Sequence, residues 1–499
     1  MYKPSSEDFE KLCQYGNMIP VYKEILADMD TPVSVLQKLM RDKEKNVFLI
    51  ESVEQCERIG RYSFIGVNPR SILRIKNGEV FIEEDGEISR EKLAGNPFET
   101  LKSILQRYKP VAHEELPRFI GGAVGYMGYG MVHYFENIPQ DNPDDLNLDD
   151  AYFMITDTIV VFDHAKNKIM VVSNTHIDKD SDPKKVYAQA KNDIDSIIAT
   201  LSQPIAMAPC EIVIPQEDVT LESNMTRDEF EDSVRKAKEY IRAGDIFQVV
   251  LSQRFKTKTT ASPLSIYRAL RSINPSPYMY FLYLDGFHII GSSPEIMVRY
   301  EDGVAEVRPI AGTRKRGKNI AEDIELEKDL LADPKERAEH IMLVDLGRND
   351  LGRVCEFKTV RLPQDQFMII EHYSHVMHIV TDVIGSLKEG CDMFDLARAA
   401  FPAGTVSGAP KIRAMQIIDE LENLCRGPYA GAVGYFSFHG NLDTAIAIRT
   451  MILKDDTVYI QAGAGIVADS DPSSEYLETV NKAKALFKAV QLAQQLENK

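Results

Sequence analysis

The sequence lacks tryptophan altogether and holds only six cysteines among its 499 residues. The cysteines form no C-x-x-C pair, which argues against a zinc knuckle or a redox dithiol, and their scarcity is typical of a reducing compartment. No run of about 18 apolar residues is present, and the N-terminus is polar and acidic, unlike a signal peptide. We therefore expect a cytoplasmic protein that does not span a membrane.

Positive charge is also in short supply, because 58 lysines and arginines face 76 acidic residues for a formal net charge of −18. Nucleic acids and anionic membranes both call for basic patches, so we expect neither as a partner. A small anionic substrate needs only local positive groups and stays compatible with this balance. The composition, 44% hydrophobic and 27% charged, is that of an ordinary globular protein with a large buried core.

Short β-rich runs and amphipathic helices alternate along the chain. Residues 47–50, 62–66 and 71–75 are predicted strands, and Asn77-Gly78 is a hairpin signal. Residues 185–201 and 226–243 are predicted helices, the second with a capping box, and the proline-containing segment 203–222 is a candidate linker. We expect an α+β architecture with a regulatory N-terminal part, 1–205, and a larger C-terminal part, 223–499.

A predicted helix begins at Asp333 as N-cap and Pro334 as first residue, and Gly347 is its expected end. Glu336 and Glu339 lie three residues apart and therefore share one face. Two such carboxylates suit a hard cation if others converge on them, and Mg²⁺ with several waters is the usual choice. A capping role for Glu336 explains the same spacing without a metal.

A second predicted helix, beginning near residue 471, carries Glu475, Glu478 and Lys482 on one face beside its apolar stripe. This helix could supply a second carboxylate pair to the same cation. An ordinary salt bridge between Glu478 and Lys482 on a solvated face explains the spacing equally well. Spacing alone favours the capping and salt-bridge interpretations for both helices.

Residues 458–462 are a predicted strand followed by Gly463, Ala464 and Gly465, a match to the dinucleotide fingerprint G-x-G-x-x-A. We reject that function because too little chain follows for a second βαβ strand. A glycine turn leading into a helix would still expose backbone N–H groups to a carboxylate or phosphate. A tight turn that merely requires glycine is an equal alternative.

The histidines at 372, 375 and 378 suggest an H-x-x-H metal site. Residues 374–384 are a predicted strand, in which residues three apart point to opposite faces, so chelation is disfavoured. His378 alone could act as an acid or base, or be structural. The segment 404–411 lacks the Gly-Lys-Ser/Thr of a phosphate loop, and Glu295 sits at a strand end.

Together and in this order, these segments resemble the chorismate-utilising enzymes. The resemblance covers about residues 223–499, and the N-terminal half is similar to the large subunit of anthranilate synthases through residues 49–52 and 60–64. It implies that family's layered α/β sandwich, in which large mixed or antiparallel sheets pack with helices. The matching segments are 247–252, 293–295, 309–313, 336–340, His378, 404–411, 429–431, 448–450, 463–465 and 475–478.

The resemblance implies a role for each matching residue. Mg²⁺ would be held by Glu339 and Glu478, with Glu336 and Glu475 behind them through water, and would bind the ring carboxylate of chorismate. Glu295 would be the general acid, with His378 and Thr405 at the reacting ring. The implied chorismate-binding residues are Gly312, Thr313, Tyr429, Arg449, Gly463, Ala464, Gly465 and Lys482.

Two positions distinguish the members of this family. Gln248 stands where the water-adding enzymes carry a lysine base, and glutamine cannot deprotonate water. Ala311 stands where the aminodeoxychorismate branch carries a lysine. Both favour ammonia as the nucleophile and anthranilate as the product, the first committed step of tryptophan biosynthesis. The alternatives are an aminodeoxychorismate synthase component I, an aminodeoxyisochorismate synthase that does not eliminate pyruvate, and a non-catalytic regulatory homologue that binds chorismate or tryptophan.

The resemblance also implies partners and regulation. No cysteine lies in a G-x-C-x-G elbow, so we expect a separate glutamine amidotransferase subunit to supply ammonia, in a heterotetramer of two large and two small subunits. Feedback inhibition by L-tryptophan is expected, and the lack of tryptophan suits an enzyme needed when that amino acid is scarce. A simple turn at 274–277 is the alternative to the effector site, whose implied residues are Glu51, Ser52, Pro277, Tyr278 and Met279.

Overall fold

Two large antiparallel sheets form the centre of the molecule. The computed structural model describes residues 1–41, 45–52, 60–111, 115–205, 221–373 and 376–497. Within these residues the first sheet has thirteen strands, the second ten and a small third sheet three. Every neighbouring strand pair that they form is antiparallel. The expected α+β class with large sheets is confirmed.

The strands of each sheet follow an order that departs widely from the order of the chain. The first sheet runs β1 (Tyr2–Lys3), β2 (Met18–Leu26), β11 (Lys168–His176), β10 (Thr158–Asp163), β4 (Tyr62–Val67), β3 (Val47–Glu51), β14 (Tyr278–Tyr283), β15 (Phe287–Ser293), β25 (Thr450–Lys454), β26 (Thr457–Ile466), β13 (Gln248–Lys258) and β12 (Glu222–Ser223), with β22 (Gly408–Ala409) on β13. The second runs β21 (Val383–Ser386), β17 (Val304–Val307), β16 (Ile296–Glu301), β24 (Leu442–Ile446), β23 (Ala432–Ser437), β8 (Gly122–Met127), β9 (Ala151–Thr156), β5 (Ser71–Lys76), β6 (Glu79–Glu84) and β7 (Glu87–Lys92). The third runs β18 (Ile310–Lys315), β20 (Val376–Val380) and β19 (Ile369–His372).

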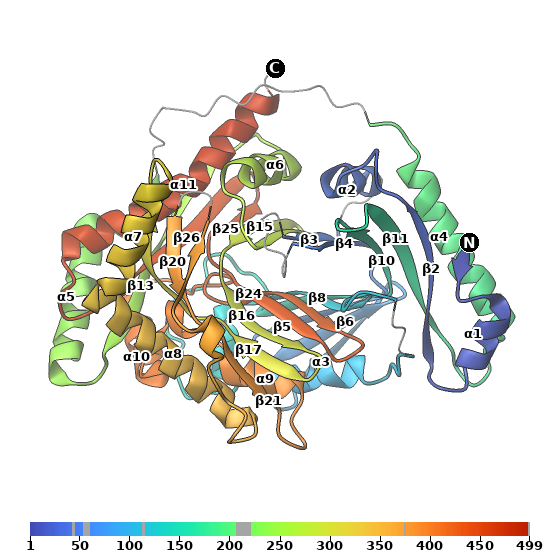
Figure 1. Cartoon of the computed structure of the whole chain (residues 1–499), viewed down its shortest axis with the longest axis horizontal. Helices are drawn as coiled ribbons and strands as arrows, with labels where there is room; N and C mark the ends of the chain where they lie inside the picture. Colours follow the sequence, from blue (N-terminus) through green and yellow to red (C-terminus); the bar gives the residue numbers. More distant parts are fainter. Residues whose placement is uncertain (42–44, 53–59, 112–114, 206–220, 374–375, 498–499) are drawn as a thin grey trace.

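Helices cover the outer faces of the two large sheets (Figure 1). The helices are α1 (Ser6–Leu12), α2 (Pro32–Met40), α3 (Pro97–Leu105), α4 (Pro183–Leu201), α5 (Arg227–Ala243), α6 (Pro263–Ile273), α7 (Ile320–Ala332), α8 (Pro334–Val354), α9 (Met393–Ala400), α10 (Lys411–Leu421) and α11 (Pro472–Glu497), with 3₁₀ turns η1 (Tyr129–Tyr134), η2 (Gln364–Gln366) and η3 (Gly404–Val406). Among the described helices, none is long and apolar enough to cross a bilayer.

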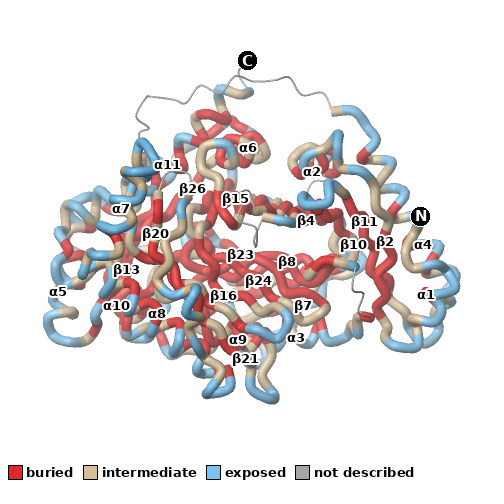
Figure 2. Tube along the Cα trace, viewed as in Figure 1, coloured by how far each residue is buried: buried red, intermediate tan, exposed pale blue. Residues whose placement is uncertain are grey.

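The core lies between the sheets and beneath the helices, where the strands are buried (Figure 2). Phe48 and Phe64 of the first sheet share one apolar cluster with Val124 and Tyr126 of the second. Strands in this layer are buried on both faces, and their sequences are accordingly near-continuous apolar runs. The layered arrangement fixes the strand ends on which the candidate site is built.

Strands from the two halves of the chain are neighbours in both large sheets. Glu51 of β3 is opposite Met279 of β14, and Gly122 of β8 is opposite Ser437 of β23. The division at 205 and 223 stays a prediction, and most of the predicted linker, 206–220, lies outside the described residues. Whatever the division, the two halves share their hydrogen-bonded sheets.

Local signals in the sequence are largely confirmed. Asn77 and Gly78 have φ of 50° and 74° at the turn between β5 and β6, as a type I′ hairpin requires. Helix α5 begins with the predicted capping box of Thr226 and Glu229. The predicted strand 374–384 is two strands, β20 and β21, and 374 and His375 lie outside the described residues.

The predicted end of a helix at Gly347 is wrong. Helix α8 continues to Val354, with Leu351 and Val354 buried in the core. A Cβ at Gly347 would lie 2.9 Å from Val307 Cγ2, so this glycine permits close packing against a strand. The apolar residues that follow keep the helix going where a left-handed cap was expected.

Candidate active site

The N-terminal turns of helices α8 and α11 carry the predicted carboxylate pairs. Asp333 caps α8 by accepting hydrogen bonds from the Lys335 and Glu336 backbone N–H groups at 2.9 and 3.3 Å. Burial raises the pKa of Glu339, and the neighbouring Glu336 and Glu478 carboxylates raise it further. The two helices therefore bring their acids together, which spacing alone did not establish.

Helix α11 contributes Glu475, Glu478 and Lys482. Burial raises the pKa of Glu475, and the Glu478 carboxylate adds to the rise. Lys482 Nζ lies 2.7 Å from Glu478 Oε1, so the salt bridge offered as the alternative is formed as well. The same ammonium donates to the Gly463 carbonyl at 2.9 Å, which ties this helix to strand β26.

This cluster has the chemistry of a divalent-cation site. Carboxylates that raise one another's pKa are relieved by a cation between them. Within the described part of the chain, no three acidic, histidine or cysteine side chains converge tightly enough to enclose a metal ion by themselves. Mg²⁺ usually keeps several waters and is held by one or two carboxylates. Glu336 has a second partner, because its Oε1 lies 3.3 Å from Arg314 Nη1.

The prediction of a glycine turn at 463–465 is wrong, because the segment is the end of strand β26. Gly463 is opposite Ser252 and Gly465 is opposite Val250 in β13. A Cβ at Gly463 would lie 2.6 Å from the Tyr429 hydroxyl, and one at Gly465 would lie 2.6 Å from Gln248 Nε2. The two glycines make room for side chains that lie across the strand.

One edge of this strand nevertheless lacks a partner strand near its end, among the residues that the structure describes. Strand β25 pairs with β26 only as far as Ile460 among the described residues. Lys482 reaches the Gly463 carbonyl on that edge. The N–H and C=O of a strand residue point to the same edge, so the amides of Gly463 and Gly465 face it too. The amides of these two glycines thus have no partner strand on that edge, within the described residues, although the turn is absent.

Glu295 lies between strands β15 and β16 with 8% of its surface exposed. Burial raises the pKa of its carboxyl to about 8, and Thr405, Arg449 and Lys482 limit the rise. The side chain is therefore protonated near neutral pH and ready to donate. The three residues that limit the rise are predicted site residues as well, so they lie close to this carboxyl.

His378 faces the strand that carries Gly312 and Thr313. Its Nδ1 lies 2.8 Å from the Gly312 carbonyl and 3.1 Å from the Thr313 hydroxyl. A carbonyl only accepts, so Nδ1 carries the proton and Nε2 has a free lone pair. Burial lowers the pKa of His378 and the Arg449 charge lowers it too, which keeps the imidazole neutral.

The remaining predicted residues lie at the same strand ends. Gln248 is the first residue of β13, and a hydrogen bond from its side chain lowers the pKa of Glu339. Its Oε1 is buried with no hydrogen-bond partner among the described residues. Arg449 has a φ of 49° between β24 and β25, and Ala464 is fully buried. The structure thus gathers the predicted catalytic, binding and metal residues around one place.

The predicted effector residues meet because β3 pairs with β14. Glu51 is buried and accepts hydrogen bonds from the Tyr267 hydroxyl at 2.6 Å and from Arg271 Nε at 2.7 Å. The hydroxyl of Ser52 is buried with no hydrogen-bond partner in the described part. Pro277 directly precedes β14, so it lies next to Tyr278 and Met279 at the start of that strand.

Sequence reasoning missed the charged partners of these residues. Tyr267 and Arg271 lie four apart on α6, a spacing that could have marked a shared face for Glu51. Arg299 donates to the Tyr278 hydroxyl at 2.7 Å, and that hydroxyl lies 3.1 Å from Asp443 Oδ1. No local sequence signal connects these, because Tyr278 lies 21 residues from Arg299 and 165 residues from Asp443.

Comparison with known proteins agrees with this geometry. The family model described as chorismate binding enzyme matches residues 45–488. The chain is 48% identical over 498 residues to anthranilate synthase component 1 of Acetivibrio thermocellus, covering 99% of both. It is 50% identical over 492 residues to the same component of Aquifex aeolicus, covering 98% of both. The crystal structure of anthranilate synthase component I from Streptococcus pneumoniae TIGR4 aligns with a TM-score of 0.77 at 38% identity, covering 93% of this chain and 98% of that one.

Proposed function

The chain belongs to the chorismate-binding enzyme family and is an amino-accepting lyase that forms anthranilate from chorismate, and we propose the role of each residue in that reaction. The observation that carries the proposal is Glu295, a buried carboxyl with its pKa raised to about 8, beside Arg449, Lys482 and Thr405. An acid that holds its proton among cations is what the departure of a ring hydroxyl requires.

Chorismate carries two carboxylates, and the site offers a positive region for each. Arg449, with the Tyr429 hydroxyl and the open amides of Gly463 and Gly465, binds the enolpyruvyl carboxylate, for which arginine offers a two-pronged donor. Lys482 adds charge beside the ring carboxylate. The ring itself lies against residues Gly312 and Thr313.

The residues that would hold Mg²⁺ are Glu339 and Glu478, with Glu336 and Glu475 reaching it through water. The ion supplies positive charge for the ring carboxylate, which four clustered glutamates would otherwise repel. This part of the proposal is supported by the raised pKa of Glu339 and of Glu475, which comes from burial and from the neighbouring carboxylates.

The reaction has two stages. Ammonia attacks ring C2, the ring double bonds shift, and the C4 hydroxyl leaves as water with the proton of Glu295. Loss of the C2 proton then breaks the C3–oxygen bond and makes the ring aromatic. The departing enolpyruvate takes up a proton at its methylene carbon to become pyruvate. In this proposal the Nε2 lone pair of His378 takes or steers the C2 proton. Gln248 Oε1, which has no hydrogen-bond partner among the described residues, accepts a hydrogen bond from ammonia.

The identity of the nucleophile follows from Gln248 and Ala311. A glutamine amide cannot deprotonate water, and the buried methyl of Ala311 in β18 cannot attack the ring. Ammonia needs no base of this kind because it is already nucleophilic. The relatives named anthranilate synthase component 1 favour this product over the aminodeoxychorismate, intermediate-releasing and non-catalytic alternatives.

A second chain supplies the ammonia in this proposal. The relatives' designation as component 1 implies a partner component. Burial raises the pKa of the Cys355 and Cys425 thiols to about 11, the opposite of what a glutaminase nucleophile needs. We expect a separate amidotransferase subunit, two copies of each chain, and control by L-tryptophan bound near Glu51 and Ser52.

One assay tests the function. Purified chain with chorismate, Mg²⁺ and ammonium at alkaline pH should generate anthranilate fluorescence. With glutamine in place of ammonium, the chain alone should produce none. An aminated product that keeps its enolpyruvyl group, identified by mass, would refute anthranilate formation, and product from glutamine alone would refute the separate amidotransferase.

A further inference from the structure

A buried ion pair lies behind the proposed substrate site. The side chains of Arg426 and Glu422 are 1% and 5% exposed, and their nearest N and O atoms are 2.6 Å apart. The guanidinium holds the carboxylate with two nitrogens, Nε at 2.9 Å and Nη2 at 2.6 Å. Burying such a pair is costly and adds little net stability by itself. Its benefit must therefore come from the geometry that it imposes.

The remaining donors of Arg426 reach two separate segments of the backbone. Nη1 donates to the Val406 carbonyl and Nη2 to the Val250 carbonyl, both at 2.7 Å. Val406 follows Thr405 in η3, and Val250 is opposite Gly465 in β26. One planar group thus joins the loop beside the acid to the strand beside the anion site.

Aromatic packing adds a third segment. The guanidinium carbon of Arg426 lies 4.7 Å from the centre of the Tyr129 ring and 5.6 Å from that of Tyr429. Tyr429 is the residue whose hydroxyl lies over Gly463. Stacking on aromatic rings restrains the plane of the guanidinium, and hydrogen bonds restrain its N–H edge. Together they resist tilting of the group.

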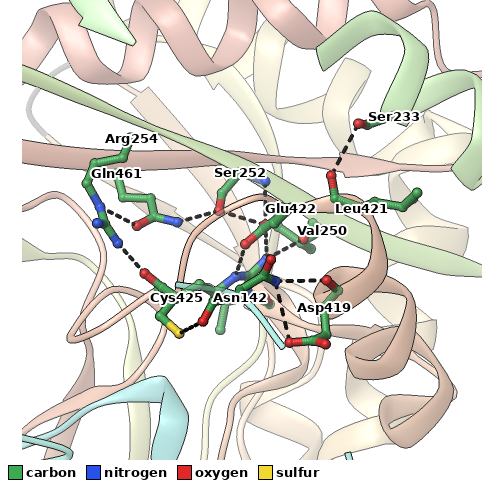
Figure 3. Close-up of polar contacts among 12 residues, drawn as sticks. Asn142, Ser233, Val250, Ser252, Arg254, Asp419, Leu421, Glu422, Cys425 and Gln461 are labelled. Atoms are coloured by element: carbon green, nitrogen blue, oxygen red, sulfur yellow. Dashed lines mark hydrogen bonds and ion pairs between the residues drawn. The ribbon is translucent and has the colours of Figure 1, made fainter. Parts of the chain in front are cut away.

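Glu422 completes the arrangement on its other side. Its Oε1 accepts from the Ser252 N–H and the Ser252 hydroxyl, both at 2.8 Å, and Gln461 Nε2 donates to that hydroxyl at 2.8 Å (Figure 3). With the two contacts to Arg426, the carboxylate has about the four hydrogen bonds that it can accept. It therefore cannot swing without breaking several contacts at once.

We propose that Glu422 and Arg426 are positioning residues for chorismate conversion, holding Thr405, Tyr429 and the end of strand β26 in one fixed arrangement. This inference rests on the roles assigned under the proposed function. Neither residue touches the reacting atoms in this assignment, and both act through the backbone and rings that they hold. Misplacing reacting groups by about 1 Å can cost about a hundredfold in rate.

The Arg426→Lys variant tests this directly. Lysine keeps the charge, but a single nitrogen cannot hold the carboxylate and two carbonyls in one plane. At a temperature where circular dichroism shows a folded protein, we expect kcat/KM for chorismate to fall at least about tenfold, with a higher KM as well as a lower kcat. Loss of folded protein alone lowers kcat and leaves KM unchanged.

Arg254→Lys is the matched control. Arg254 is 4% exposed and also binds a carboxylate, that of Asp145. Its guanidinium donates as well to the Cys425 carbonyl and, at 3.2 Å, to Gln461 Oε1 (Figure 3). The hydrogen bonds of its guanidinium go to neither Val250 nor Val406. Its bond to Gln461 is made to the amide oxygen, whereas the amide nitrogen of Gln461 holds Ser252. We expect this variant to keep the wild-type KM for chorismate. An equal rise in KM in both variants would overturn the proposal, because any buried arginine would then have the same effect.

A milder variant keeps the proposal testable if Arg426→Lys does not fold. Ser252→Ala removes one donor to Glu422 and should raise the chorismate KM in the same direction by a smaller factor. Wild-type KM in Ser252→Ala together with wild-type KM in a folded Arg426→Lys overturns the positioning role. Failure of the wild-type chain to make anthranilate from chorismate and ammonium overturns the proposed function instead, so the two failures are distinguishable.

Discussion

Glu295→Gln is the most informative single change, because it removes the proposed proton donor and keeps its size. General acid catalysis typically contributes about 10²- to 10⁴-fold, so we expect kcat to fall by about that factor. With free ammonia held constant, the wild type should lose activity as the pH rises through about 8, the pKa of this carboxyl. The residual activity of the variant should not fall in this way as the pH rises through 8.

The Glu295 carboxyl should also make the free energy of unfolding depend on pH. Its pKa is about 8 in the fold against 4.5 for the ordinary group, so the folded state binds the proton more tightly than the unfolded chain. The stabilisation of the fold by this bound proton is complete below pH 4.5. It decreases as the pH rises and is lost above about pH 8. Between pH 6 and 9 the wild type should lose about 3 kcal/mol that the glutamine variant does not lose. For a chain of this length that amounts to about 3 °C in Tm.

Thermal unfolding of both proteins from pH 6 to 9 measures this difference. An exposed carboxyl changed in the same way, Glu389→Gln, is the control and should follow the wild-type curve. Parallel curves for the wild type and Glu295→Gln, or a wild-type rate that stays constant through pH 8, would refute the raised pKa and with it the assignment of Glu295 as the acid.

Three further perturbations test other parts of the site. Glu339→Ala or Glu478→Ala should abolish anthranilate formation, and calorimetric titration should show Mg²⁺ binding at least about tenfold weaker. Unchanged Mg²⁺ binding would show that these glutamates are not the metal ligands. Ser52→Arg should retain activity and lose inhibition by tryptophan in the fluorescence assay, and a fully sensitive variant would count against the effector site. Gly463→Ala should raise the chorismate KM, because its Cβ would lie 2.6 Å from a tyrosine hydroxyl, whereas Gly352→Ala, where nothing lies within 4 Å, should leave KM unchanged.

Much of the secondary structure could be predicted from the sequence because its causes are local. The hairpin at Asn77 and the capping box at Thr226 depend on residues within three positions of one another. The end of α8 could not be read from Gly347, since packing against Val307 decided what that glycine does. The pairing of strands depends on tertiary structure, and no local sequence pattern predicts that β3 lies beside β14.

The site shows the same division. Spacing placed Glu336 with Glu339 and Glu475 with Glu478 on shared helix faces, but only the fold brings the two helices together. The raised pKa of Glu295 comes from burial, which no motif encodes. The resemblance to a family supplied roles that the residues alone left balanced against capping and salt bridging.

The interleaving of the two halves in the first sheet bears on how the protein is made. Strands β25 and β26 lie between β15 and β13, so the centre of that sheet needs residues near 450–466. A nascent chain that has not yet released them presents two long unpaired strand edges, which invite aggregation. Contacts across hundreds of residues also slow folding. We expect the native sheet to close only after synthesis is nearly complete, and a chain truncated before β25 to depend on chaperones for its solubility.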